Sequence, residues 1–209
     1  MYAARGDDSS QTNANESQSI ASQSIPNRSI ASEENARECV AIDCEMVGVG
    51  ARGHRSVAAR VAIVDAHGTC LLDTFARPRK PVTQYRTRWS GICPGNLARA
   101  PGIDSVRQRV LRLICGKILV GHALHHDLRA LNIQHEAGLQ RDTACCPELR
   151  AALDAAVPGK FLARQAPSLK NLCKYVLDVE IQRGEHCTVE DAASTMRLFR
   201  YACEARGPG

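Results

Sequence analysis

The sequence is poor in several features that mark whole classes of protein. Aromatic residues make up only 4% of the 209 residues. No apolar run approaches the ~20 residues that a membrane-spanning helix needs, which excludes a membrane protein. The ten cysteines form no Cys-x-x-Cys pair, which argues against zinc-ribbon and thioredoxin-like proteins. The first residues also lack the apolar stretch of a secretory leader, so we expect an intracellular protein with reduced thiols.

Positive charge is concentrated in the larger part of the chain. The whole sequence carries 27 Lys and Arg against 22 Asp and Glu, a formal net charge of +5. Residues 1–38 contain three arginines and six acids, which leaves a net charge of +8 on residues 39–209. Residues 1–38 are also rich in Ser, Asn and Gln, a composition that buries too little apolar surface to fold. We therefore expect a disordered tail over 1–38, a single domain over 39–205 and a short C-terminal tail over 206–209.

Hydrophobic patterning changes at residue 39 and predicts one α/β domain. Runs rich in β-forming residues predict strands over residues 39–49, 57–65, 70–76, 118–120 and 141–143. Apolar residues at helical spacing predict helices over residues 104–115, 125–131, 168–177 and 189–205. Strands joined by tight turns, followed by alternating helices and strands, predict a mixed five-stranded sheet flanked by helices.

Two acidic residues interrupt the first predicted strand. Asp43 and Glu45 alternate with apolar residues, so both carboxylates point to the same face of the sheet. Adjacent like charges on a central strand repel each other and lose hydration, and a divalent cation between them would reverse both penalties. The alternative is an edge strand with two surface acids, but the apolar residues on either side argue against an edge.

Two further acids lie at the margins of predicted apolar helix faces. Asp127 flanks a stripe of leucines, where an acid favoured by the helix dipole is an equally good interpretation. Asp191 lies at the edge of the buried side of the last helix, and it also fits a capping box that begins at Thr188. His186 precedes that helix and belongs to the loop that leads into it. The sequence alone leaves both alternatives open.

Taken together, four carboxylates directed towards the interior indicate a metal centre. Hard oxygen ligands suit Mg²⁺ or Mn²⁺ better than zinc. Two such ions, about 4 Å apart, can activate water and stabilise the leaving oxygen in phosphodiester cleavage. A neutral histidine beside the attacking water is a suitable general base near neutral pH.

Five segments of the sequence resemble one enzyme family, in family order. They are residues 41–48 (AIDCEMVG), 85–92 (YRTRWSGI), 120–131 (VGHALHHDLRAL), 141–143 (RDT) and 186–192 (HCTVEDA). This set resembles the DEDDh 3′→5′ exonucleases of the ribonuclease H-like fold, within the interferon-stimulated exonuclease, apoptosis-enhancing nuclease and RNA exonuclease group. Leu128, where Phe is common, and Cys187-Thr188, where Ser-Ser is usual, are the departures from the family pattern.

The resemblance implies a role for each site residue. Asp43, Glu45 and Asp191 would hold one metal ion, and Asp43 with Asp127 would hold the second. His186 would orient and deprotonate the attacking water. The resemblance also implies that Met46 and Arg86 lie near the terminal nucleotide and its sugar, with Arg88 and Leu124 as further candidates for substrate contact. The implied reaction releases nucleoside 5′-monophosphates from single-stranded RNA and, in some members, from DNA.

Two rival interpretations compete with this one. The segment Gly48-Val-Gly-Ala-Arg-Gly53 fits the dinucleotide-binding fingerprint of an NAD-dependent oxidoreductase. That fingerprint must open a helix and be followed by an acid ~20 residues later. Asp65 comes too soon, so we expect a turn between two antiparallel strands instead. The second rival is an RNA-binding module of the same fold with weak catalysis, which the complete set of site residues argues against.

Clusters of basic residues suggest how a polyanion is held. Positive side chains crowd two stretches, Arg77, Arg79, Lys80, Arg86 and Arg88 in the first and Arg107, Arg109 and Arg112 in the second. Such contacts provide salt-sensitive affinity with little base preference, and Tyr85 and Trp89 are candidates for base stacking. We expect a monomer acting on single-stranded RNA or DNA with a free 3′ end. The resemblance favours the nucleus or nucleolus, with the cytoplasm as the alternative.

Overall fold

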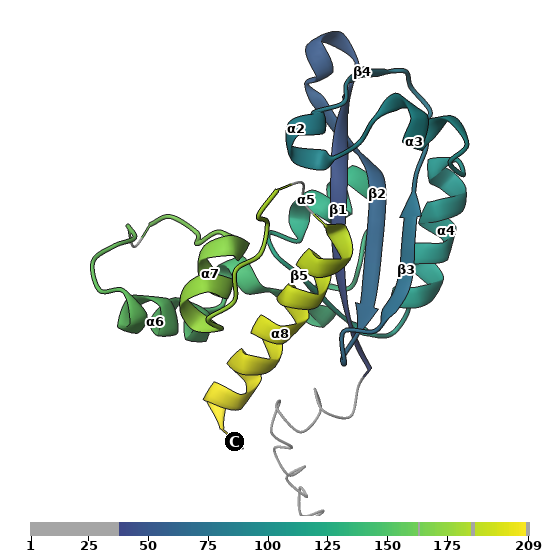
Figure 1. Ribbon diagram of the computed structural model, residues 1–209. Helices are drawn as coiled ribbons and strands as arrows, with labels where there is room; N and C mark the ends of the chain where they lie inside the picture. The colour runs from purple at the N-terminus through teal and green to yellow at the C-terminus, as the bar shows by residue number, and fades with distance from the viewer. Residues whose placement is uncertain (1–37, 163, 185–186, 208–209) are drawn as a thin grey trace, which may run out of the picture.

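The computed structural model describes residues 38–162, 164–184 and 187–207 (Figure 1). The predicted N-terminal tail therefore lies outside the described residues, apart from Glu38, which forms an ion pair with Lys117 at 2.5 Å. At the other end, the last helix extends to Arg206, and residues 208–209 of the predicted C-terminal tail also lie outside.

A mixed sheet forms the centre of the fold. Its strands are β1 (Cys39–Val49), β2 (Arg55–Asp65), β3 (Cys70–Phe75), β4 (Val82–Gln84), β5 (Ile118–Gly121) and β6 (Gln140–Asp142). Five of them run in the order β3-β2-β1-β5-β6, and β4 pairs with the far end of β1. β2 pairs antiparallel with both β1 and β3, whereas β5 pairs in parallel with β1 and β6 in parallel with β5. The predicted mixed sheet is confirmed, and β4 is an additional short strand outside the five predicted ones.

Helices flank the sheet on both faces. They are α2 (Thr87–Ser90), α3 (Pro94–Ala98), α4 (Ile103–Ile114), α5 (His125–Leu131), α6 (Pro147–Ala156), α7 (Leu169–Val176) and α8 (Thr188–Arg206), with short 3₁₀ turns at Ala51–Gly53, Ala137–Leu139 and Thr143–Cys145. α4, α5, α7 and α8 confirm the four predicted helices to within one residue at each end. α2, α3 and α6 were not predicted.

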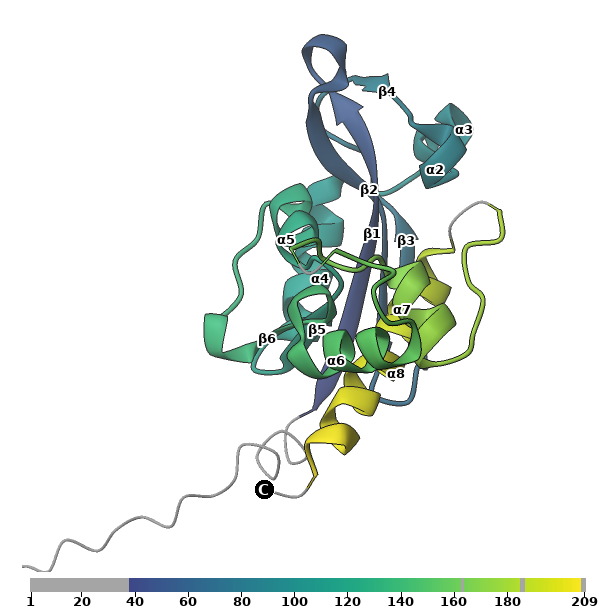
Figure 2. The same cartoon turned by 90° about the vertical axis from the view of Figure 1, so that its left-hand side faces the viewer.

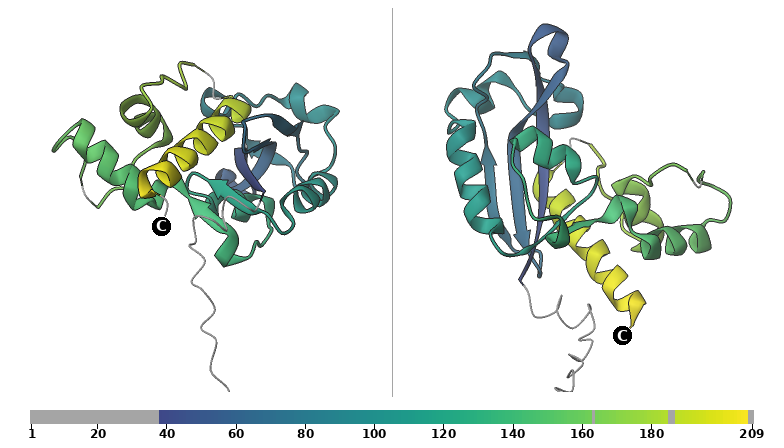
Figure 3. Two further views of the ribbon diagram at one scale, coloured as in Figure 1. Left: turned by 90° about the horizontal axis from the view of Figure 1, so that it is seen from below. Right: turned by 180° about the vertical axis from the view of Figure 1, so that it is seen from behind.

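Two apolar cores lie on opposite faces of the sheet (Figure 2). On one face α4 and α5 pack against Val40, Ile42 and Cys44 of β1. On the other face α8 packs against Ala41 and its neighbours on β2 and β5. A third cluster joins α6 and α7 to the outer side of α8 (Figure 3). Because side chains alternate along β1, the residues that follow Ala41 at every second position face α8.

The glycine-rich segment between β1 and β2 forms a turn. β1 ends at Val49, a short 3₁₀ turn follows, and β2 returns antiparallel from Arg55. A Cβ on Gly48 would lie 2.5 Å from the carbonyl oxygen of Gly53, so only glycine allows the two backbones to approach this closely. This geometry agrees with the expected hairpin turn and removes the structural basis for the NAD-binding interpretation, since no α-helix follows the glycines.

Candidate active site

Asp43 and Glu45 lie on the central strand and face α8. β1 has β2 on one side and β5 on the other, and the apolar residues Val40, Ile42 and Cys44 occupy its opposite face. The prediction that both carboxylates share one face is therefore confirmed. The pairing register with β2 shifts immediately after Glu45, a β-bulge of the kind that often adjusts side-chain direction next to functional sites.

Asp191 completes a cluster of three carboxylates. It lies in the first turn of α8 and is only 2% exposed. One ligand atom from each of Asp43, Glu45 and Asp191 lies within 4.8 Å of the others. Gln182, in the segment between α7 and α8, donates a hydrogen bond from Nε2 to Oδ2 of Asp191 at 2.9 Å. The helix α8 thus brings the distant C-terminal acid to the two acids of β1.

The capping-box interpretation of Asp191 is wrong. The residue before the helix is Cys187, and Thr188 is the first helical residue rather than the N-cap. The Thr188 hydroxyl is buried and has no hydrogen-bond partner among the described residues. The Asp191 carboxylate instead accepts the hydrogen bond from Gln182. Its position at the buried edge of α8 therefore serves the carboxylate cluster and not the helix terminus.

Asp127 approaches β1 from the opposite face, on α5. It is 4% exposed, and it accepts hydrogen bonds from the backbone N–H and the thiol of Cys44. The β5 pairing of β1 extends only to Ala41, so at Cys44 this side of β1 is no longer paired with β5. Asp127 accepts the hydrogen bond from the Cys44 N–H that a further residue of β5 would otherwise accept. This contact also directs a fourth carboxylate towards Asp43.

The electrostatics of the cluster match this crowding of negative charge. Burial, followed by the charges of Asp127, Asp191 and Glu45, holds the pKa of Asp43 well above its ordinary value. Burial and Asp191 raise the pKa of Glu45 to about 7, against the opposing influence of Arg60. Burial raises the pKa of Asp127 to about 8. Three buried acids with raised pKa values, next to the carboxylate of Asp191, are arranged to gain from a nearby cation.

Arg60 is the cation that lies beside the cluster. It stands opposite Glu45 in the β1–β2 register. Its Nε and Nη2 donate to the two carboxylate oxygens of Asp73 on β3, each at 2.8 Å. Because Asp73 engages this guanidinium in a bidentate pair, Arg60 compensates only part of the negative charge on Glu45.

A carboxylate on β6 holds the turn that positions Asp127. Asp142 accepts hydrogen bonds from the backbone N–H groups of Ala123 and Leu124, at 2.8 and 3.0 Å, and from Ala144 at 3.0 Å. Ala123 has a left-handed backbone (φ 55°), which this carboxylate stabilises at the start of α5. Residues 141–143 enter the sequence-based prediction as a strand and as one segment of the resemblance, and neither assigns this role to Asp142.

The remaining predicted residues occupy different environments. His186 lies outside the described residues. Met46 is half-buried and packs against the α4–α5 core, whereas Leu124 is only 1% exposed. Arg86 donates to the Ser56 hydroxyl at 2.8 Å and to the Gly53 carbonyl at 2.9 Å, so it braces the β1–β2 turn. Arg88 is exposed, with its guanidinium 6.0 Å from the ring centre of Trp89. Their roles in substrate contact stay predictions.

The donor set fits a hard divalent cation. Carboxylate oxygens are the ligands that Mg²⁺ and Mn²⁺ prefer, and three of them converge here in a buried setting. The pKa values above show that these acids repel each other as they ionise. A bound cation would relieve that repulsion, so Asp43, Glu45 and Asp191 are the residues that could hold it.

Comparison with known proteins agrees with this geometry. Residues 40–199 match the family described as RNase_T, exonuclease. RNA exonuclease 4 of Mus musculus is 42% identical over 160 residues, which cover 77% of this chain and 35% of that protein. RNA exonuclease 4 of Mycosarcoma maydis is 48% identical over 163 residues, covering 77% and 41%. Apoptosis-enhancing nuclease of Homo sapiens is 43% identical over 165 residues, covering 78% and 49%.

Solved structures share the same fold. The pseudoubiquitin hydrolase–RNA exonuclease module of Saccharomyces cerevisiae Pan2, in complex with AAGGAA RNA, matches with a TM-score of 0.67 and 26% identity. The match covers 81% of this chain and 29% of that chain. This chain spans less than half the length of the curated relatives just named. The matched family, together with the carboxylates on β1 and α8, shows that the chain belongs to the RNase T, or DEDDh, family of exonucleases.

Proposed function

We propose that this chain is a metal-dependent 3′→5′ exonuclease that hydrolyses single-stranded nucleic acid to nucleoside 5′-monophosphates. The observation that carries the proposal is the convergence of Asp43, Glu45 and Asp191 within 4.8 Å, inside the segment that matches the exonuclease family. Buried acids of one sign are unfavourable for folding, so their retention at one point is best explained by the cation they would hold.

The cofactor in this proposal is a pair of Mg²⁺ or Mn²⁺ ions. Asp43, Glu45 and Asp191 would hold one, and Asp43 with Asp127 would hold the other. When bound, such ions supply a nucleophilic water and neutralise charge on the phosphate and the leaving oxygen. The protein's own contribution is positional. β1 fixes two carboxylates, α8 and Gln182 orient Asp191, and Asp142 holds the turn before Asp127.

His186 is the proposed general base, as the family resemblance implies, and the described chain resumes at Cys187. Cys187 immediately follows His186, and it lies close enough to Asp43 and Arg60 to affect the pKa of each. The chain therefore enters α8 next to the carboxylates. In this proposal His186 would accept the proton of the water that attacks the terminal phosphodiester.

RNA is the proposed substrate, with DNA as the alternative. The similar Pan2 module is described in complex with RNA, and several similar proteins are named RNA exonucleases.

Among the described residues, no helix has both the length and the apolar character to cross a membrane. A nuclear or nucleolar location stays part of the proposal.

A time course on 5′-labelled single-stranded RNA and DNA tests the proposal. With Mg²⁺ or Mn²⁺ we expect a ladder that shortens from the 3′ end, and with EDTA we expect none. Asp191→Asn should abolish the ladder, whereas Glu190→Gln, an exposed acid one residue earlier on α8, should leave it intact. Binding without any cleavage would support the rival RNA-binding module, and cleavage in EDTA would exclude the metal mechanism.

A further inference from the structure

Two adjoining hollows lie against α5, the helix that carries Asp127. The larger, about 620 Å³, is lined at one end by Met46 and His126, which are the sequence neighbours of Glu45 and Asp127. The smaller, about 270 Å³, shares Arg55 and Arg129 with the larger hollow and extends to the segment before β4. Because the two hollows share walls, they form one continuous groove. We refer to it as the basic groove.

The basic groove is lined by cations. The basic residues along it are Arg55, Arg79, Lys80, Arg107 and Arg129, and no Asp or Glu is among the described residues that line either hollow. Arg55, Lys80 and Arg129 are exposed, and no described carboxylate pairs with any of the three. Unpaired cations facing a concave surface repel each other, and an anionic ligand would relieve that repulsion.

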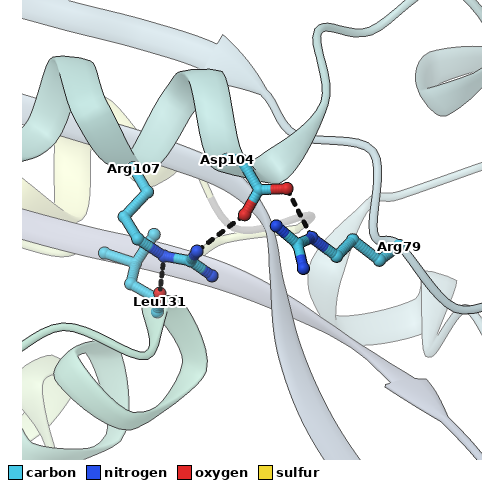
Figure 4. Close-up of polar contacts among 4 residues, drawn as sticks. All are labelled: Arg79, Asp104, Arg107 and Leu131. Carbon is cyan, nitrogen blue, oxygen red and sulfur yellow. Dashed lines mark hydrogen bonds and ion pairs between the residues drawn. The ribbon is translucent and has the colours of Figure 1, made fainter.

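Asp104 accepts hydrogen bonds from the two remaining arginines of the groove, Arg79 and Arg107 (Figure 4). One of its oxygens accepts from Nε of Arg79, and the other accepts from Nη1 of Arg107 at 2.7 Å. Arg107 is held further by a hydrogen bond from its Nε to the carbonyl oxygen of Leu131 at 2.7 Å. These contacts use Nε of Arg79 and leave its two terminal nitrogens available. The arrangement joins the two basic clusters of the sequence, which lie on different elements, at one carboxylate.

We propose that the basic groove binds the phosphodiester backbone of the nucleotides upstream of the 3′ end, and this rests on the proposed function of the carboxylate cluster. The groove includes Met46 and His126, the sequence neighbours of Glu45 and Asp127, and several cations line it, which matches a chain of phosphates rather than one anion. Its described lining contains no Phe, Tyr or Trp, and its only rings that could stack on a base are those of His54 and His126, so we expect the groove to contact mainly the backbone rather than the bases.

The proposal predicts that catalytic efficiency depends on substrate length. The test compares the triple variant Arg55→Gln, Lys80→Gln, Arg129→Gln with the wild-type chain on a dinucleotide and on an oligonucleotide of about ten nucleotides, within the ~4–16 that single-strand channels cover. We expect only a small loss of kcat/KM on the dinucleotide, because its single internucleotide phosphate leaves most of the groove unoccupied. On the longer substrate, we expect a loss of about threefold per cation, on the order of thirtyfold in all.

A charge-matched control variant distinguishes phosphate binding in the groove from general electrostatic attraction to the positively charged chain. Arg99→Gln, Arg197→Gln, Arg200→Gln removes the same charge from exposed arginines that line neither hollow. This control should retain the length dependence of the wild-type chain. Equal losses in the two triple variants would overturn the proposal in favour of long-range steering. An equal loss on the dinucleotide and the longer substrate would also overturn it, because the substitutions would then act on the catalytic site itself.

Binding without turnover makes the groove testable independently of catalysis. Fluorescence anisotropy with labelled single-stranded RNA in EDTA requires neither metal nor hydrolysis. We expect the groove variant to lower the slope of log affinity against log salt by about 2, since each lost phosphate contact accounts for ~0.7 on single strands. An unchanged salt slope would overturn the groove proposal. Failure of the proposed function would appear separately, as absent metal-dependent cleavage by a wild-type chain that still binds RNA.

Discussion

Replacing Glu45 with Gln should stabilise the metal-free protein while abolishing its activity. Glu45 is 8% exposed, and burial together with Asp191 raises its pKa to about 7 from 4.5. The native carboxyl group therefore keeps its proton to higher pH than the unfolded one does. Stability is lost as pH rises between these two values, because the unfolded chain releases the proton first. Because Gln does not ionise, the variant should not lose this stability as the pH rises.

The size of the effect follows from the pKa difference. A rise from 4.5 to about 7 corresponds to on the order of 3 kcal/mol of destabilisation once Glu45 is ionised in both states. At about pH 5 the same group contributes under ~1 kcal/mol, since the native carboxyl group is still protonated. The stabilisation by Glu45→Gln should therefore be large at about pH 8 and small at about pH 5.

Urea unfolding in EDTA at these two pH values measures the difference. The free energy of unfolding of Glu45→Gln should exceed that of the wild-type chain by up to ~3 kcal/mol at the higher pH. Excess Mg²⁺ should stabilise the wild-type chain and not the variant. Glu190→Gln, which removes an exposed acid, serves as the control and should change neither result. If Glu45→Gln were destabilising at both pH values, the account of repelling buried carboxylates would be refuted.

Three further substitutions test the supports of the site. Asp142→Ala removes the acceptor of three backbone N–H groups and should cost about 2–3 kcal/mol in urea unfolding, with a fall in kcat. Gln182→Leu removes a donor to a buried carboxylate, so it should cost about 1–3 kcal/mol in EDTA and raise the half-saturating Mg²⁺ concentration about tenfold; an unchanged metal dependence would refute the orienting role. Gly121→Ala places a Cβ 2.7 Å from Leu124 and should cost about 1–3 kcal/mol; a neutral effect would contradict the tight start of α5.

The acidic site was predictable because its residues violate the hydrophobic pattern around them. Asp43 and Glu45 stand out in an apolar strand, and the period of two assigns them to one face without any tertiary information. Asp191 was harder, because a capping box explains the same spacing. Only the structure shows that α8 begins one residue earlier than expected and that Gln182 contacts Asp191.

Other features depend on contacts that local sequence does not encode. The three-residue strand β4 exists through its pairing with Gly48 and Val49, far away in the chain. Arg86 braces the β1–β2 turn through contacts with Ser56 and Gly53, about 30 residues earlier in the chain, and its role in substrate contact stays a prediction. α6 is different, since Pro147 at the first helical position and Glu148 in the first turn were available signals that the sequence analysis did not use.

The central claim is that the carboxylates of β1 and α8 hold the metal used to remove nucleotides from a 3′ end. Its most direct test is single-turnover release of the terminal nucleotide from RNA labelled at the last internucleotide phosphate, with the wild-type chain and Asp43→Asn in parallel. The account predicts that the wild-type chain releases labelled nucleoside 5′-monophosphate in Mn²⁺ but not in EDTA, and that Asp43→Asn releases none. Release by Asp43→Asn at the wild-type rate, or release in EDTA, would contradict it.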